Sequence, residues 1–86
     1  LVRQAVANVL EARREWASWP FEDRAAVFLR AADLLATTWR QRLNAATMLG
    51  QSKNVFQSEI DAACEMTGFF RFNVQFAREL CSEQPI

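Results

Sequence analysis

Apolar residues recur at helical spacing along most of the chain, and the alternation typical of β-strands is absent. The first such stretch predicts a helix from about Val2 to Ser18. Pro20 ends it, because the residue before a proline is pushed out of the α region. A second helix is expected to begin near Phe21 or Glu22, where acidic side chains suit the positive end of the helix dipole.

Two further helices are expected in the second half of the chain. Thr37 or Thr38 is expected to cap a short third helix that runs to Leu49. Gly50 follows, where a left-handed residue would end that helix. The fourth helix is the longest, from about residue 53 to residue 80, with Ser52 as its N-cap.

The fourth helix is apolar on two opposite sides. At about 100° per residue, one stripe consists of Ile60, Ala63, Thr67, Phe70, Val74 and Ala77. The second stripe consists of Phe69, Phe72 and Phe76. The other three helices can cover only one of these sides. We therefore expect an all-α, four-helix fragment whose second apolar face packs against something else.

The composition agrees with this expectation. Of 86 residues, 51% are hydrophobic, including 7 Phe and 3 Trp. Small chains have a poor ratio of volume to surface, so one small core cannot hide this much apolar material. Either the chain self-associates or it packs against partner structure, and we favour the second explanation.

The charged and chemically reactive residues exclude several functions. Ten basic and ten acidic residues are mixed along the chain, which argues against a nucleic-acid partner. No apolar run reaches the roughly 18–20 residues that crossing a membrane requires. Histidine is absent, and there is no glycine-rich phosphate loop, so we expect no catalytic, cofactor-binding or metal site within the chain.

The two cysteines are expected to be structural. Cys64 and Cys81 lie 17 residues apart on one predicted helix, about 25 Å along its axis, which no disulfide can span. Free thiols suit a reducing compartment. Neither has an obvious activating neighbour, so we expect both to be buried in helix packing.

Glu65 is the most unusual residue of the long helix. It falls on the side of the second phenylalanine stripe, with Asp61 one turn earlier. A carboxylate on an aromatic face either pairs with an arginine or borders a cavity that holds a ligand. From composition alone we favour the arginine. On the same helix, Gly68 allows a close backbone approach or is a tolerated defect, and Arg71 and Arg78 mark an interface or, as we favour, a solvated edge.

Several segments together resemble the aldehyde dehydrogenase superfamily. They are residues 23–25 (DRA), 31–35 (AADLL), 48–53 (MLGQSK), 59–63 (EIDAA), 69–73 (FFRFN) and 84–86 (QPI). The resemblance runs over essentially the whole chain in one register. The most similar branch is the one that acts on Δ1-pyrroline-5-carboxylate, the cyclic form of glutamate γ-semialdehyde. The segments that resemble this branch are residues 28–33 (FLRAAD), 47–51 (TMLGQ), 59–63, 69–73 and 84–86. Ser52 departs from the glycine that many relatives have there, which affects only the helix start.

The resemblance implies that residues 1–86 are a single helical segment from the N-terminal part of a larger α/β dehydrogenase fold. The parent would oxidise glutamate γ-semialdehyde to glutamate with NAD in proline breakdown. Its nucleophilic cysteine, acid–base glutamate and NAD-binding domain would lie outside this segment, which would be inactive alone. The parent is expected to be a homo-oligomer in the mitochondrial matrix or, in a bacterium, the cytoplasm.

The resemblance also changes the interpretation of the long helix. In the family this helix lines the aldehyde tunnel, and Glu65 matches a glutamate that borders the substrate pocket. Asp61 matches a tunnel-facing position. Both are therefore predicted to be substrate-binding. The competing hypothesis is a helical interaction module that uses the Phe69, Phe72 and Phe76 face to bind a partner protein.

Overall fold

The computed structural model describes residues 1–85, and these residues form helices and turns without a strand. Ile86, the last residue of the 84–86 motif, lies outside the described residues. The elements are α1 (Val2–Ser18), α2 (Phe21–Ala36), α3 (Arg40–Gln51), α4 (Val55–Ser58), the π-helix η1 (Glu59–Cys64) and α5 (Glu65–Ser82). Because α4, η1 and α5 follow one another without a break, the predicted four helices with a long last one are confirmed.

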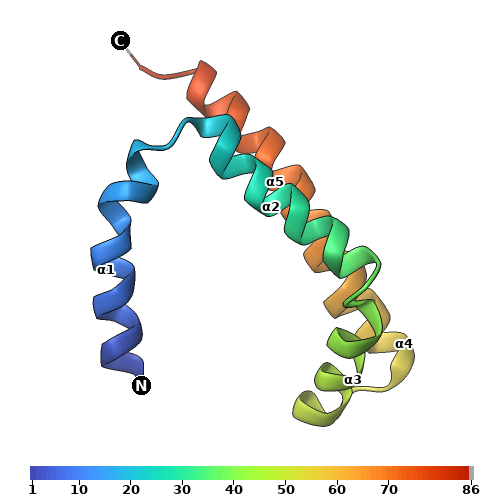
Figure 1. Cartoon of the computed structure of the whole chain (residues 1–86). Coiled ribbons are helices and arrows are strands. Elements are labelled where there is room, and N and C mark those ends of the chain that lie inside the picture. Colours follow the sequence, from blue (N-terminus) through green and yellow to red (C-terminus); the bar gives the residue numbers. More distant parts are fainter. Residues whose placement is uncertain (86) are drawn as a thin grey trace.

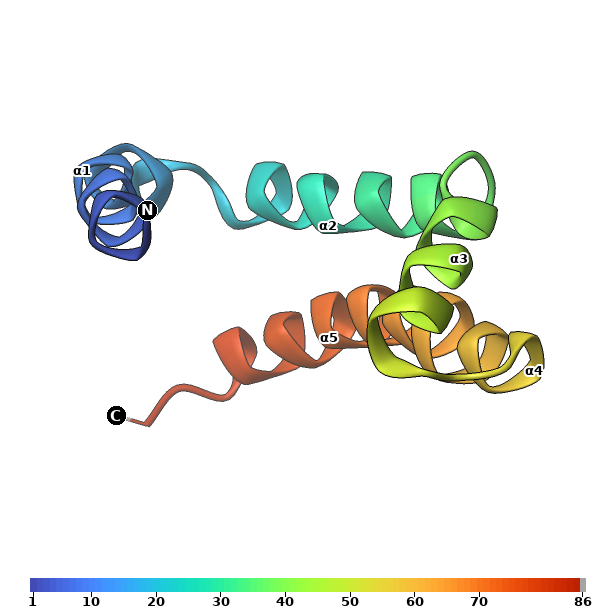
Figure 2. The ribbon, with the colours of Figure 1, turned by 90° about the horizontal axis from the view of Figure 1, so that it is seen from below.

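The helices α2 and α5 lie side by side and form the body of the molecule (Figures 1 and 2). At one end of this pair, α3 and α4 lie beside η1. At the other end, a short connection leads to α1, which stands apart from the pair (Figure 1). No helix within residues 1–85 is both long and apolar enough to cross a membrane.

Small side chains form the interface between α2 and α5. Ala25 and Ala32 of α2 are buried there, and Thr67 and Val74 are buried on α5. On each helix the two residues are seven positions apart, or about two helical turns. Small residues at this spacing let two helices approach closely along one face. The first predicted stripe of the long helix therefore does face α2.

One member of that stripe, Ile60, is exposed. The reason is the π-helix, whose hydrogen bonds span five residues instead of four. Ser58 and Ala63, five positions apart, are both buried. The prediction assumed a uniform α-helix, so it wrongly assigned Ile60 to the buried stripe.

The predicted helix ends were partly wrong. No side chain caps α3: it begins after Trp39, and the hydroxyl of Thr37 donates to the Asp33 carbonyl instead. Gly50 continues α3, and Ser52 adopts the left-handed conformation at φ 55°. Glycine would be the least strained residue in that conformation.

The long helix begins with a different cap from the predicted one. Asn54 accepts a hydrogen bond from the Gln57 amide, and the Gln57 side chain accepts one from the Asn54 amide, which makes a reciprocal capping box. The helix therefore starts at Val55, two residues later than predicted. Ser52 is excluded as its N-cap because its backbone already serves the turn after α3.

Two further expectations about the long helix were wrong, those for the cysteines and the arginines, and of the two alternatives for Gly68 the tolerated defect agrees with the structure. Cys64 and Cys81 are free, as predicted, but both are exposed instead of buried in helix packing. A Cβ at Gly68 would meet no atom within 4 Å, so no backbone approaches it closely. Arg71 and Arg78 do not form a merely solvated edge, because each pairs across the interface with an acidic residue of α2.

The molecule exposes more surface than a compact protein of its size. Its radius of gyration is 16.1 Å, whereas a compact domain of this length would have about 12 Å. Its accessible surface is 7176 Å², against roughly 5,200 Å² expected for its mass. Large apolar side chains on every long helix contribute to this surface. The dimensions support the expectation that these helices normally pack against additional structure.

Candidate functional site

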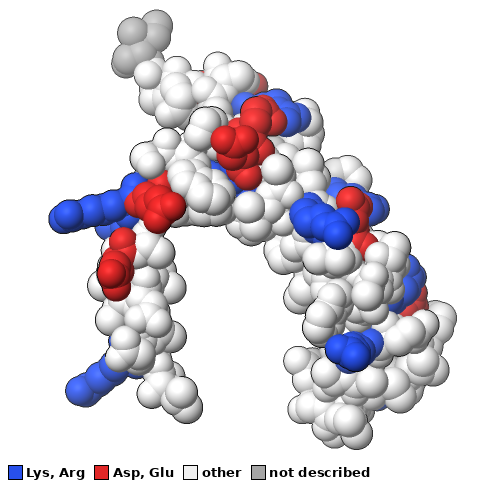
Figure 3. Space-filling view, in the orientation of Figure 1, with Lys and Arg blue, Asp and Glu red and all other residues white. Residues whose placement is uncertain are grey.

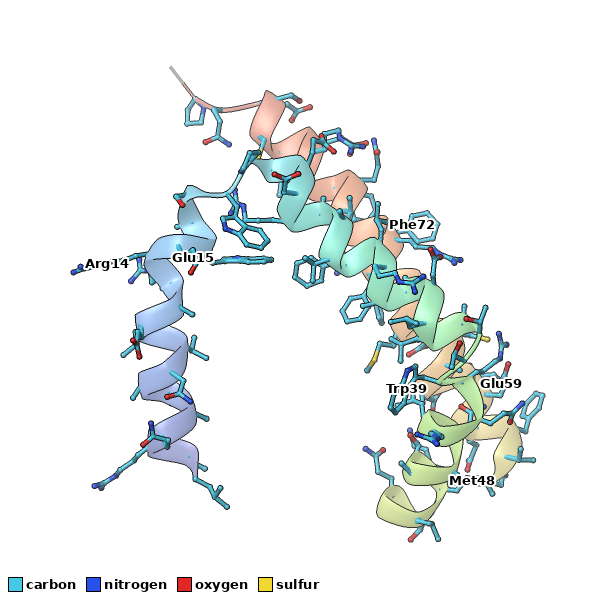
Figure 4. All side chains as sticks on the ribbon, viewed as in Figure 1. Arg14, Glu15, Trp39, Met48, Glu59 and Phe72 are labelled. Carbon is cyan, nitrogen blue, oxygen red and sulfur yellow. The ribbon has the colours of Figure 1, made fainter. Side chains whose placement is uncertain are left out.

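The outward face of α5 carries the predicted second stripe. Phe69, Phe72 and Phe76 are 59%, 63% and 52% exposed. The rings of Phe72 and Phe76 stack with centroids 6.3 Å apart, and Phe72 points away from the body of the pair (Figure 4). The stripe therefore forms a continuous aromatic surface that no other part of residues 1–85 covers.

Glu65 is the first residue of α5 and lies one turn before Phe69. Its side chain is exposed, and among residues 1–85 its carboxylate forms no ion pair. The arginine pairing that composition favoured is thus not formed within this segment. The structure leaves a carboxylate at the end of an aromatic surface.

Asp61 has a different environment from Glu65. It lies in η1, and its Oδ2 is 2.7 Å from the Nζ of Lys53, which comes from the loop before α4. The two predicted substrate-binding carboxylates are therefore not equivalent. The charge of Asp61 is compensated by a neighbouring cation, whereas that of Glu65 is not.

A polar cluster that the sequence analysis missed lies at the start of the long helix. Arg40 and Asn44 of α3 both bind the Glu59 carboxylate: Arg40 through an ion pair and Asn44 through a hydrogen bond of 2.6 Å. The Cys64 sulfur completes the cluster, 3.6 Å from Nη2 of Arg40 and 3.7 Å from Oε1 of Glu59. Figure 4 places Glu59 at the junction of α3 with the long helix.

The charges of this cluster stabilise one another. The hydrogen bond from Arg40, followed by that from Asn44, lowers the pKa of Glu59 below its ordinary value. Asn44 is only 5% exposed, so its amide lies inside the junction. Arg40 and Asn44 are four residues apart on α3, so they share a face. That spacing was visible in the sequence, but nothing there identified Glu59 as their common partner.

An apolar groove lies at the other end of the α2–α5 pair. It has a volume of about 280 Å³ and opens beside the C-terminal end of α1. Trp16 and Phe28 meet there edge to face with centroids 6.4 Å apart, and Phe28 meets Phe70 at 5.7 Å. The groove is lined by Trp16, Phe21, Arg24, Ala25, Phe28, Phe70, Asn73, Val74 and Ala77. Trp16, close to the C-terminal end of α1, therefore packs against Phe28 of α2.

The described residues do not offer a site for a dinucleotide. A phosphate-binding turn requires glycines outside regular helix so that backbone amides can point at the phosphates. Gly50 lies within α3 and Gly68 within α5, and neither has a positive φ. NAD therefore does not fit residues 1–85 by themselves.

Charged side chains are mixed over the surface. The face in Figure 3 shows blue and red residues side by side along α2 and α5. Ion pairs are formed by Arg71 with Asp33 at 3.0 Å and by Arg78 with Glu22 at 2.8 Å. These two ion pairs join α2 to α5.

Comparison with known proteins identifies relatives over the whole chain. The aldehyde dehydrogenase family model matches residues 1–85. The mitochondrial Δ1-pyrroline-5-carboxylate dehydrogenase of Emericella nidulans is 53% identical over 99% of this chain. That of Bos taurus is 54% identical over 100% of it. In both cases the chain spans only 15% of the relative's length.

A solved structure gives the same result for the fold. The Δ-pyrroline-5-carboxylate dehydrogenase from Mycobacterium tuberculosis is 61% identical and matches 95% of this chain with a TM-score of 0.89. Only 15% of that chain is covered. Sequence and backbone therefore agree over nearly the whole chain, and the chain belongs to the aldehyde dehydrogenase family.

Proposed function

We propose that the whole protein oxidises glutamate γ-semialdehyde, formed from Δ1-pyrroline-5-carboxylate, to glutamate with NAD as the electron acceptor, as a step of proline breakdown. The observation that carries this proposal is the identity of 53–61% shared with the proteins of that name from Emericella nidulans, Bos taurus and Mycobacterium tuberculosis. Residues 1–86 would be a single helical segment from the N-terminal part of this enzyme.

Within the enzyme, the segment would form a wall of the substrate pocket. The outward face of α5 supports this role, because an exposed aromatic surface that ends in an unpaired carboxylate needs a covering structure. Glu65 would bind the ammonium group of the amino-acid aldehyde, directly or through one ordered water. Asp61, already paired with Lys53, would border the tunnel and contribute less to binding.

The remaining chemistry would come from outside this segment. The nucleophilic cysteine, the acid–base glutamate and the NAD site would belong to the remainder of the enzyme, and the isolated segment would be inactive. The exposed Cys64 and Cys81 are not assigned a catalytic role. The enzyme would be a homo-oligomer, in the mitochondrial matrix of a eukaryote or the cytoplasm of a bacterium.

The test is NADH formation by the longest natural polypeptide that contains this segment. We expect a clear preference for Δ1-pyrroline-5-carboxylate over simple aliphatic aldehydes. Glu65→Ala is expected to raise the KM for the pyrroline substrate and to change that for propanal little. Glu79→Ala, which removes another exposed carboxylate of α5, is the matched control and should leave both unchanged.

Absence of NADH formation with every aldehyde would contradict the proposal. The competing interaction module would then be the better explanation for the exposed Phe69, Phe72 and Phe76. Phe→Ala changes along this stripe distinguish the two. They should lower activity or stability of an enzyme, whereas in an interaction module they should abolish binding to a partner protein.

A further inference from the structure

We propose that Arg40, Asn44 and Glu59 form a positioning cluster that braces the π-helix η1 and thereby fixes Glu65 at the substrate pocket. This inference rests on the substrate role proposed for Glu65. It concerns residues that would not touch the substrate, since Arg40 and Asn44 both bind the Glu59 carboxylate and Asn44 is buried in the junction.

The cluster spans the whole π-helix. Glu59 is the first residue of η1 and Cys64 is the last, and Nη2 of Arg40 approaches both side chains. In an α-helix two residues five positions apart point in directions about 140° apart. In a π-helix their directions lie closer together, because its hydrogen bonds join residues five apart and each turn therefore holds more residues than an α-helical turn. The π conformation therefore brings Glu59 and Cys64 to the same guanidinium.

Glu65 is tied to the π-helix through its own backbone. Its amide donates to the carbonyl of Ile60, five residues earlier, and to that of Ala62. A change of η1 to another helical form would replace these bonds and move the start of α5. Because Glu65 directly follows Cys64, the side chain with the proposed substrate role lies next to the braced turn.

The π conformation needs support from outside its own backbone. Such turns are rare and occur mostly as single turns inside α-helices, often at functional sites. Here the support comes from α3: Arg40 also donates to the Ala36 carbonyl at 3.3 Å, which fixes the guanidinium at the end of α2. Asn44 holds the second oxygen of Glu59, so the carboxylate cannot rotate freely. The cluster thus joins three elements at the base of α5.

A double-mutant cycle in the complete enzyme tests the inference. Kinetics with Δ1-pyrroline-5-carboxylate and with propanal are measured for wild type, Glu59→Gln, Glu65→Ala and the double variant. If Glu59 acts through Glu65, Glu59→Gln should raise the KM for the pyrroline substrate by about five- to tenfold and have almost no further effect once Glu65 is alanine. The KM for propanal should change little.

Two controls separate positioning from general loss of structure. Asn44→Ala keeps the Arg40–Glu59 ion pair and should repeat the same non-additive pattern with a smaller change, even if Glu59→Gln folds poorly. Arg71→Gln breaks an ion pair elsewhere on α5 and should leave the preference for the pyrroline substrate unchanged.

The possible failures are distinguishable. If Glu65→Ala raises the KM for the pyrroline substrate but Glu59→Gln has the same effect in both backgrounds, the positioning role is wrong and the role of Glu65 stands. If Glu65→Ala itself changes nothing, the substrate role of Glu65 is wrong and the positioning role falls with it. Equal losses with both aldehydes after Glu59→Gln would assign the cluster to stability alone.

Discussion

The α2–α5 pair and α1 are built from helices of similar length in opposite surroundings. Residues of α2 and α5 bury one another, and two ion pairs cross the pair. In contrast, α1 has 17 residues and buries none of them. Yet α1 carries its own apolar stripe of Val2, Val6, Val9 and Leu10, which is exposed. Periodicity therefore predicts a helix, but it does not predict which element covers the apolar face of that helix.

The difference predicts unequal stability along the isolated chain, and this is the largest effect we expect. Most helical stability in proteins comes from packing of an apolar face, and α1 buries no residue, so it should fray unless it packs on a partner. Amide hydrogen exchange of the 86-residue chain should show protection in α2 and α5 that exceeds that in α1 by orders of magnitude. Equal protection in α1 would mean that it packs on the rest of the chain in solution.

The next effect concerns the interface between α2 and α5. Ala32 is 0% exposed, so Ala32→Leu should force the two helices apart and destabilise the chain by about 1–3 kcal/mol. Urea denaturation followed by circular dichroism measures the change. Ala26→Leu places the same side chain on the exposed side of α2 and is the control. Similar stability of the two variants would argue against this interface.

A smaller effect, of opposite sign, is expected on α5. Gly68→Ala should stabilise the chain by about 0.5–1 kcal/mol, because alanine is the better helix former and the added Cβ meets open space. The same denaturation experiment measures it. Destabilisation would instead show that another backbone approaches Gly68 closely, as one interpretation of the sequence suggested.

The ion pair between Glu22 and Arg78 should have the smallest effect. Its hydrogen bond from Arg78 lowers the pKa of Glu22 below the ordinary value of 4.5. A lowered carboxyl pKa adds stability above that value, and the contribution is lost as the pH falls through the folded-state pKa. Arg78→Gln should therefore destabilise the chain slightly at pH 7 and hardly at pH 3, and high salt should reduce the difference. An equal loss at both pH values would assign the effect to lost packing.

Local signals predicted the helices well and their ends less well. Pro20 ended the first helix as expected, because its ring restricts the preceding residue whatever surrounds it. Gly50, Ser52 and Asn54 were harder to rank, since each can end or begin a helix. The outcome depended on Asn54 and Gln57 satisfying each other's backbone amides. Two competing caps a few residues apart differ by too little free energy for sequence alone to decide.

In the candidate site, too, some features were predicted from the sequence and others were not. The outward aromatic stripe and the placement of Glu65 at its end followed from helical spacing. Helical spacing did not predict the Arg40–Asn44–Glu59 cluster, because its members come from two elements. Arg40 and Asn44 of α3 lie 19 and 15 residues before Glu59. Whether Asp61 is paired was also invisible, since Lys53 reaches it from a loop eight residues earlier.

The sequence by itself determined the helical class, the two apolar sides of the long helix and the family. Periodicity and family motifs depend only on the order of residues along the chain. Only the tertiary structure decided that residues 59–64 form a π-helix, that both thiols are exposed and that Arg71 and Arg78 pair with α2. These features depend on which helices meet. Contacts between elements that are distant in the chain determine these features, and such contacts cannot be deduced from the spacing of neighbouring residues.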